Sequence, residues 1–380
     1  MTDPTAAPGG EPTPGPAAPQ PTAPAAPHAA PPPRWPVVVR ALGVAAFTAL
    51  VTLSFFFFLK NKHSLNFVLI DGTWDDGRTF YTIATQGYRG LPITEYRELG
   101  LYPLLVHLLH PVAGIYSLLI VSLTFSALGN VLVYFILRRW YAGEWLAFGA
   151  ACVMAVARQP VFFMQFIKWQ MPSMTICNAI QGSEGPYVAA LLAAFYLYKA
   201  DRLPWAFVCA GLASVTRMTG IVVAFGLYVD LLLRREWKRS FWALVSAAFL
   251  LAHFAYYWHL TGDFFVVFKA HHTYNHVESA FTWPFRDLLI ALKGQYRELW
   301  EGPWGWVVIY AYCIAGLVIL ALKRQRTLLL ITAPVFVMFL CLQNWSLHGR
   351  YYETLFGIPF AYVMLIAGRR GAAQSEPGRS

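Results

Sequence analysis

Residues 113–137 decide the kind of fold that this chain can adopt. They read AGIYSLLIVSLTFSALGNVLVYFIL without one charged side chain, and the basic pair Arg138-Arg139 follows directly. An apolar run of about 20 residues is long enough to cross the hydrocarbon core of a bilayer as a helix. The sequence therefore predicts a transmembrane helix here, with its basic end at one membrane surface.

Similar apolar runs fill most of the 380 residues. Hydrophobic residues make up 57% of the chain and charged residues 13%, whereas a soluble domain carries about 25% charged residues. This composition excludes a soluble enzyme, a disulfide-stapled secreted domain and a nucleic-acid-binding protein. We expect an all-α polytopic membrane domain over residues 35–370. Its ten expected spans are about 37–59, 113–137, 145–165, 186–199, 204–217, 219–233, 240–259, 304–322, 327–342 and 353–368.

Two polar tails flank this domain. Residues 1–34 are almost all Pro, Ala, Gly and Thr, a composition that cannot bury enough apolar area to fold. We expect a disordered cytoplasmic tail there, and a second short cytoplasmic tail over residues 371–380.

The placement of charge predicts the topology. With a cytoplasmic N-terminus and ten spans, the inside segments carry 16 basic and 7 acidic residues, and the outside segments carry 13 and 12. Lys and Arg are enriched in cytoplasmic loops of membrane proteins. We therefore expect a multi-pass plasma membrane protein, of the bacterial inner-membrane kind, with both termini cytoplasmic. The net charge of +10 then needs no nucleic-acid partner.

Three long loops fall on the outer side, at 60–112, about 158–185 and about 260–303, and their many aromatic and charged residues favour function there. In the first of these, Trp74-Asp75-Asp76 precedes a short amphipathic helix expected over 79–86, which Gly87 ends. Adjacent carboxylates beside an aromatic ring at a membrane surface are partly desolvated, and this raises the pKa of at least one. Such a carboxylate suits a general base for a hydroxyl. The alternative is a helix cap or a solvated turn, which we favour for Asp71.

Six short motifs, spread over residues 67–366, carry a family resemblance. The first is Trp74-Asp75 followed by Tyr81, Ile83-Ala84 and Gly87-Tyr88. The others are Leu101-Tyr102-Pro103-Leu104-Leu105, Ser183-Glu184 before the apolar run 187–192, Thr216-Arg217-Met218-Thr219-Gly220, Tyr257-Trp258-His259-Leu260-Thr261-Gly262-Asp263 and Gly349-Arg350-Tyr351. Together, and in this order, they resemble the PIG-V-like mannosyltransferases, integral-membrane glycosyltransferases of the GT-C class. Two departures stand out. Tyr81 comes five residues after Asp76 and six after Asp75, where the family places it four after its Asp, and Met218 stands where the family has Pro.

The resemblance implies a GT-C-like fold with a long helical first external loop. It implies transfer of a sugar, typically mannose, from a polyprenyl-phosphate carrier to an acceptor hydroxyl on the non-cytoplasmic face, with inversion. The acceptor would be a glycan, a lipid or a protein. The catalytic base would be Asp75 or Asp76. Asp75 is favoured because it follows Trp74 directly, and Asp76 is the reserve because its spacing to Tyr81 is nearer that of the family.

Arginines at the outer ends of two expected spans are candidates for the donor phosphate. Arg350 and Arg217 could each bind phosphate through two parallel hydrogen bonds; the alternative for both is snorkelling to the interface. The expected substrate-binding residues are Trp74, Tyr81, Glu184 and Tyr351. Glu184 begins an expected span, so it could instead cap a helix.

No metal or organic cofactor is indicated. The histidines at 271, 272 and 276 have no carboxylate that completes a site within their run. Interface contacts or contacts with the acceptor are the expected roles for these histidines. The five cysteines form no CxxC pair and are expected to be packing residues.

Two other functions stay open from the sequence. A transporter or lipid flippase would have the same general topology, although transporters usually place ionisable groups at the bilayer midplane. A catalytically inactive member of the same fold is the third reading, because the spacing of Tyr81 departs from the family pattern.

Overall fold

The structure is a computed structural model that describes residues 35–61, 63–71, 76–157, 182–275, 302–341 and 355–368, with a few positions between 283 and 293. All regular secondary structure in these described ranges is helical, so the all-α prediction is confirmed. The two predicted tails lie outside the described residues.

Three long apolar stretches are each long enough to cross a membrane. The first is helix α1 (Trp35–Lys60). The second is a continuous stretch in which α3 (Leu101–Ala113) passes through a 3-10 turn (η3, Gly114–Tyr116) into α4 (Ser117–Trp140). The third joins α11 (Trp237–Ser240) to α12 (Ala243–Thr261).

The other helices of the bundle are shorter. They are α5 (Glu144–Ala157), α8 (Glu184–Lys199), α9 (Leu203–Ser214), α10 (Thr219–Leu233), α15 (Gly302–Leu322), α16 (Arg326–Cys341) and α18 (Gly357–Ala367). Each of the ten expected apolar runs therefore contains a helix. How many of these helices cross a membrane stays a prediction. The region 203–233 forms two separate short helices, α9 and α10.

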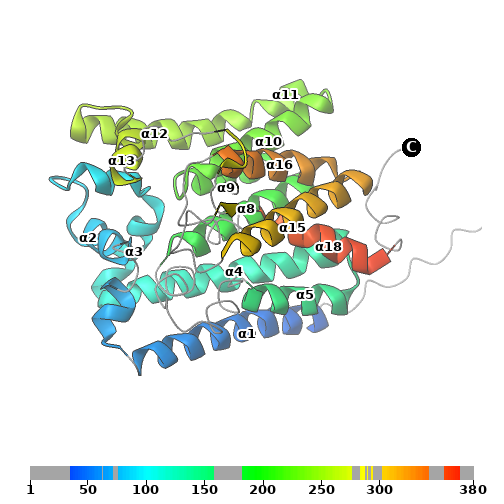
Figure 1. Cartoon of the computed structure of the whole chain (residues 1–380), viewed down its shortest axis with the longest axis horizontal. Helices are drawn as coiled ribbons and strands as arrows, with labels where there is room; N and C mark the ends of the chain where they lie inside the picture. The colour runs from blue at the N-terminus through cyan, green and yellow to red at the C-terminus, as the bar shows by residue number, and fades with distance from the viewer. Residues whose placement is uncertain are drawn as a thin grey trace, which may run out of the picture.

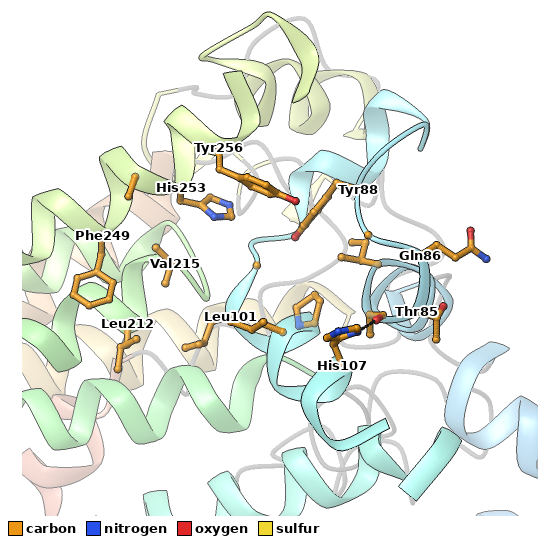
Figure 2. Close-up of a pocket in the computed structure, with 17 residues that line it drawn as sticks. Thr85, Gln86, Tyr88, Leu101, His107, Leu212, Val215, Phe249, His253 and Tyr256 are labelled. Atoms are coloured by element: carbon orange, nitrogen blue, oxygen red, sulfur yellow. Dashed lines mark hydrogen bonds between the residues drawn. The ribbon is translucent and has the colours of Figure 1, made fainter. Parts of the chain in front are cut away.

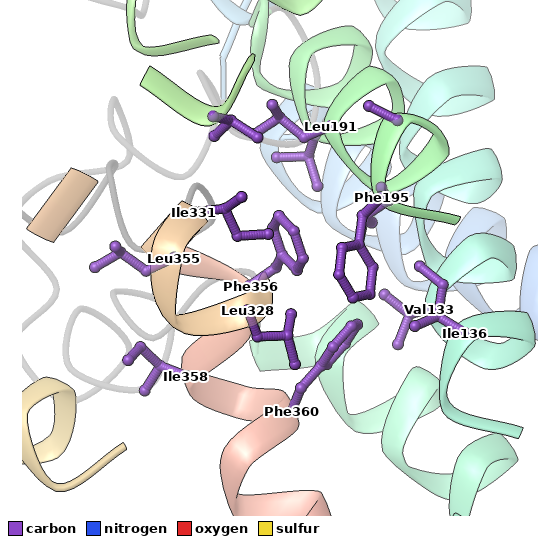
Figure 3. Close-up of a cluster of buried hydrophobic side chains, with 14 of the residues drawn as sticks. Val133, Ile136, Leu191, Phe195, Leu328, Ile331, Leu355, Phe356, Ile358 and Phe360 are labelled. Carbon is purple, nitrogen blue, oxygen red and sulfur yellow. The ribbon is translucent and has the colours of Figure 1, made fainter. Parts of the chain in front are cut away.

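Helix α4 lies at the centre of the bundle and packs against α1, α5 and α8 (Figure 1). Helix α8 also packs against α9, α10 packs against α16, and α15 packs against α18. Figure 3 shows where these pairs meet, around Phe195 of α8 and the rings of Phe356 and Phe360. The ring centroids of Phe195 and Phe356 are 5.6 Å apart, and those of Phe356 and Phe360 are also 5.6 Å apart. The C-terminal helix is thereby packed into the centre of the bundle.

One end of the bundle gathers basic side chains, and we call it the basic end. Helix α1 begins and α18 finishes at this end (Figure 1). Arg40 of α1 forms an ion pair with Glu144 of α5, and Arg138 of α4 lies 3.5 Å from the same carboxylate. Aromatic contact between Tyr141 and Phe360 places α18 beside this group. These basic residues are among those that the sequence assigned to the cytoplasmic side.

A buried carboxylate on α10 forms hydrogen bonds to α8 and α16 at the basic end. Asp230 of α10 has no exposed surface. It accepts three hydrogen bonds, from the hydroxyls of Tyr198 on α8 (2.8 Å) and Thr327 on α16 (2.9 Å) and from the guanidinium group of Arg326 on α16 (2.8 Å). Arg234, just after α10, forms an ion pair with it at 2.8 Å. Every partner is a donor, so the carboxylate is well satisfied despite its burial. The sequence analysis had not singled out Asp230.

The opposite end, which we call the loop end, holds the helices of two expected outer loops (Figure 1). Helix α2 spans Asp76–Gln86 and α13 spans Val266–Asn275. The short helix expected over 79–86 is thus confirmed and begins three residues earlier. Gly87 follows it with a φ of +74°, a conformation that glycine adopts without steric cost. Helix α3 was not expected, because residues 60–112 were all assigned to the loop.

Candidate functional site

The structure describes part of the predicted site. Tyr81, Glu184 and Arg217 are described with their side chains, and Asp76 is the first residue of α2. The other four predicted residues, Trp74, Asp75, Arg350 and Tyr351, lie outside the described residues. The candidate base and one candidate phosphate ligand therefore remain predictions.

Glu184 and Arg217, separated by 33 residues in the chain, form an ion pair in the structure. Arg217 Nη2 donates to Glu184 Oε1, and Arg217 Nε donates to Ser183 Oγ at 3.2 Å. The side chain of Glu184 is 2% exposed and that of Arg217 is 18% exposed. Arg217 is therefore the member of the pair that a ligand can approach from outside. The two motifs Ser183-Glu184 and Thr216-Arg217 thus belong to one local structure.

Two glycines allow close backbone contacts beside this ion pair, one to α4 and one to the end of α9. A Cβ atom added to Gly185 would lie 2.8 Å from the carbonyl oxygen of Ser122 on α4. A Cβ added to Gly220 would lie 2.4 Å from the backbone nitrogen of Ser214, across the turn between α9 and α10. Real Cβ atoms are not found this close to backbone atoms, so both contacts require glycine. Gly220 belongs to the Thr-Arg-Met-Thr-Gly motif, and this close turn gives that glycine a structural role.

Two further hydrogen bonds connect this region. Thr219 donates from Oγ1 to the hydroxyl of Tyr187 at 2.6 Å, so the start of α10 is bonded to α8. The backbone N–H of Leu101 donates to the carbonyl oxygen of Val215 at 3.1 Å, which joins the start of α3 to the turn before Arg217. Tyr187 has no exposed surface. The start of α8, the α9–α10 turn and the start of α3 therefore form one connected unit.

Helix α2 packs on the same unit through Tyr102. The Tyr102 hydroxyl donates to Leu118 O and lies 3.1 Å from Ser122 Oγ, and Ser122 Oγ donates to Gly182 O at 3.2 Å beside the start of α8. The ring of Phe80 on α2 contacts the Tyr102 ring edge-on, with centroids 4.8 Å apart. The helix that begins at Asp76 is thereby held against the segment that leads to Glu184.

Tyr81 faces a different neighbour. Its hydroxyl lies 3.0 Å from Nε2 of His110 on α3, and the two rings are 5.5 Å apart. Tyr81 is half-buried, so its predicted contact with a substrate stays a prediction. The Tyr81–His110 contact instead links the middle of α2 to the last turn of α3.

The fifth motif, at Tyr257, is hydrogen-bonded to the first outer loop at the loop end. The Tyr257 hydroxyl donates to Glu98 O at 2.7 Å, and the Tyr88 hydroxyl donates to the same carbonyl at 2.8 Å. Tyr96 donates to Tyr88 O at 2.8 Å. Burial raises the pKa of Tyr88 above its ordinary value, so this hydroxyl keeps its proton and its hydrogen bond. Parts of five of the six motifs are therefore packed at or near the loop end.

A cavity of about 670 Å³ lies beside this unit, between α2, α3, α9 and α12 (Figure 2). Seventeen described residues line it, and they include His107 of α3 and His253 of α12. The sequence analysis named neither histidine. The histidines inside the apolar stretches 101–140 and 237–261, two in each, were the available signal. Among the described residues, no three His, Cys, Asp or Glu side chains are placed to hold a metal ion.

Comparison of the chain with protein-family models, with curated proteins and with solved structures finds no match. The functional argument therefore rests on the residues themselves and on the resemblance stated above.

Proposed function

We propose that this protein is an integral-membrane glycosyltransferase that moves a sugar, typically mannose, from a polyprenyl-phosphate carrier to an acceptor hydroxyl at the loop end. The observation that carries the proposal is the ion pair between Glu184 and Arg217, which joins two of the six motifs beside the helix that begins at Asp76. The topology expected from charge places the loop end on the non-cytoplasmic side.

The length of α9 supports a functional position for this ion pair. Helix α9 has 12 residues and rises about 18 Å at 1.5 Å per residue, whereas the hydrocarbon core is about 30 Å thick. With the basic end at one membrane surface, the turn that carries Arg217 stops about 10 Å short of the opposite surface. Ionisable groups at such depth are costly and usually mark a functional site.

The proposed reaction is a single inverting displacement. The acceptor hydroxyl oxygen forms a bond to the anomeric carbon of the sugar while the bond from that carbon to the carrier phosphate breaks. The hydroxyl proton passes to Asp75, with Asp76 as the alternative base. Arg350 and Arg217 would stabilise the negative charge on the departing lipid phosphate. Glu184 is a positioning residue in this scheme, since it holds the Arg217 guanidinium.

A direct experiment tests the proposal. Membranes that contain the protein, and matched membranes without it, are incubated with labelled polyprenyl-phosphate hexoses, and the labelled products are separated and identified. The proposal predicts label on a new glycosylated acceptor only when the protein is present. Movement of intact labelled donor across vesicle membranes without a new product would favour the transporter or flippase instead.

A further inference from the structure

Three turns that follow α8, α10 and α15 share one backbone geometry. Each has a backbone N–H that donates to the carbonyl oxygen five residues earlier: Arg202 to Leu197 (2.8 Å), Glu236 to Leu231 (3.0 Å) and Gln325 to Leu320 (2.9 Å). This hydrogen bond defines the Schellman motif, whose left-handed residue is usually glycine. In these turns the left-handed residues are Asp201 (φ +60°), Arg235 (φ +62°) and Arg324 (φ +54°).

Arginine at a left-handed position is not explained by local structure. Asp can offset the steric cost of this conformation with a local hydrogen bond from its short side chain, but the long side chain of Arg cannot. The helix dipole favours a cation in the last turn of a helix, yet it does not require one at the position where glycine is unstrained. Residues held in rare conformations cluster at functional sites. The exposed side chains of Arg235 and Arg324 therefore call for a ligand outside the fold.

Contacts at the basic end bring the three turns together. Asp230 accepts hydrogen bonds from Tyr198, just before the first turn, and from Arg326, just after the third. Arg239, which follows the second turn, forms an ion pair with Asp201 in the first. We call the three segments the turn cluster; they are residues 199–202, 230–239 and 323–326.

The turn cluster carries a large excess of positive charge. It holds nine Lys or Arg and three Asp or Glu, a net charge of +6. All three acids are already paired, Asp230 with Arg234 and Arg326, and the other two with Arg239. Six cations form no ion pair among the described residues: Lys199, Arg202, Arg235, Lys238, Lys323 and Arg324. The surface is thus complementary to an anion.

Exposed tryptophans beside the turn cluster indicate where that anion lies. Trp205 near the start of α9, Trp237 of α11 and Trp242 just before α12 are all exposed. Trp is enriched at the depth of the lipid head groups, where its ring meets both the apolar core and water. The six unpaired cations are therefore at the level of lipid phosphates, which favours a lipid over a soluble anion.

We propose that the turn cluster binds the phosphate of an anionic phospholipid, of the phosphatidylglycerol kind, in the leaflet that the basic end faces. Arg235 and Arg324 donate to the phosphate oxygens. Arg326 uses Nε for Asp230 while its side chain is 47% exposed, so its other N–H groups reach the same phosphate. Asp230 is a positioning residue that holds this guanidinium. The site is at the end opposite the proposed transfer reaction and does not depend on it.

Equilibrium binding of tritiated dioleoyl phosphatidylglycerol to the full chain in dodecyl maltoside micelles tests the proposal. We expect saturable binding that unlabelled phosphatidylglycerol displaces at least about tenfold better than phosphatidylcholine, because each basic side chain near an anionic lipid adds about fivefold in affinity. Equal displacement by phosphatidylcholine would reduce the site to contact with acyl chains. Equal displacement by glycerol 1-phosphate would assign it to a soluble phosphate. Either result overturns the proposal.

Glycine substitutions at the left-handed positions separate binding from folding. Arg235→Gly/Arg324→Gly removes two cations, so affinity should fall about 30-fold. Glycine adopts this conformation without strain, so the thermal unfolding midpoint in lipid-free micelles should change little. Asp201→Gly is the matched control, since it makes the same change in the same motif but removes a negative charge. It should bind phosphatidylglycerol at least as tightly as wild type.

A second control distinguishes a site from general attraction to positive charge. Arg138→Gln removes one cation at the same end of the bundle, next to Glu144 and outside the turn cluster, and should leave the affinity unchanged. Unchanged binding in the Arg235→Gly/Arg324→Gly variant would overturn the proposal. Equal losses of affinity in Arg138→Gln and in a single Arg324→Gly variant would also overturn it, because the attraction would then be spread over the whole basic end.

Discussion

The ion pair between Glu184 and Arg217 should contribute to stability unequally through its two members. Glu184 is 2% exposed and Arg217 is 18% exposed. Arg217→Met leaves a carboxylate buried without its cation, which typically costs about 3–5 kcal/mol in the free energy of unfolding. Glu184→Gln leaves a guanidinium that can turn toward its exposed side. We expect a smaller loss there, about 1.5–3 kcal/mol, which is the value of one hydrogen bond to a charged group.

The double variant shows whether the two residues act together. Glu184→Gln combined with Arg217→Met leaves no isolated charge, so its loss should fall short of the sum of the single losses by about 2 kcal/mol. The assay is reversible unfolding of the purified protein in mixed micelles with increasing dodecyl sulfate, followed by circular dichroism.

A surface pair at the basic end provides the control. Glu236 and Arg239 lie 2.7 Å apart with side chains 28% and 42% exposed, and such pairs contribute at most about 1 kcal/mol. Glu236→Gln should therefore change the unfolding free energy by less than that. Two single losses at Glu184 and Arg217 that are equally small and simply add would refute a buried, coupled ion pair.

Three further predictions concern other parts of the chain. Asp230→Asn should lower the free energy of unfolding by about 3 kcal/mol or more, while the KM for the donor stays unchanged because Asp230 lies at the basic end. Arg350→Lys keeps the charge but loses the two-pronged geometry, so the KM for the donor should rise, and donor use in Arg350→Ala that matches wild type would refute this assignment. A cysteine introduced at Thr94 should react with a membrane-impermeant thiol reagent in intact cells. Labelling only after permeabilisation would show that this loop lies on the cytoplasmic side and would contradict the expected topology.

The sequence predicted the helices well where the signal is local. An apolar run needs no tertiary information to form a helix, and all ten expected runs contain one. Helix α3 was missed because His107, His110 and two prolines interrupt its apolar pattern. Only the structure shows that this segment continues through a 3-10 turn into α4.

The site was harder to predict than the fold. Sequence motifs identified Glu184 and Arg217 as separate candidates, but their pairing depends on the approach of α8 to the α9–α10 turn, a long-range contact. The same reason hid the cavity, since His107 and His253 come from helices far apart in the sequence. Glu184 was also considered as a helix cap; the structure places Ser183 at the N-cap position and directs Glu184 to Arg217.

The central claim is that a carboxylate in the first outer loop accepts the acceptor's proton. The most direct measurement is the turnover of purified protein in proteoliposomes with a labelled polyprenyl-phosphate hexose and its identified acceptor. Asp75→Asn keeps the side-chain shape and removes the basicity, so turnover should fall about 10²- to 10⁴-fold, with a smaller loss for Asp76→Asn. Asp71→Asn, in the same loop, is the control and should remain near wild type. Near-normal transfer by both the Asp75 and the Asp76 variants would contradict the account.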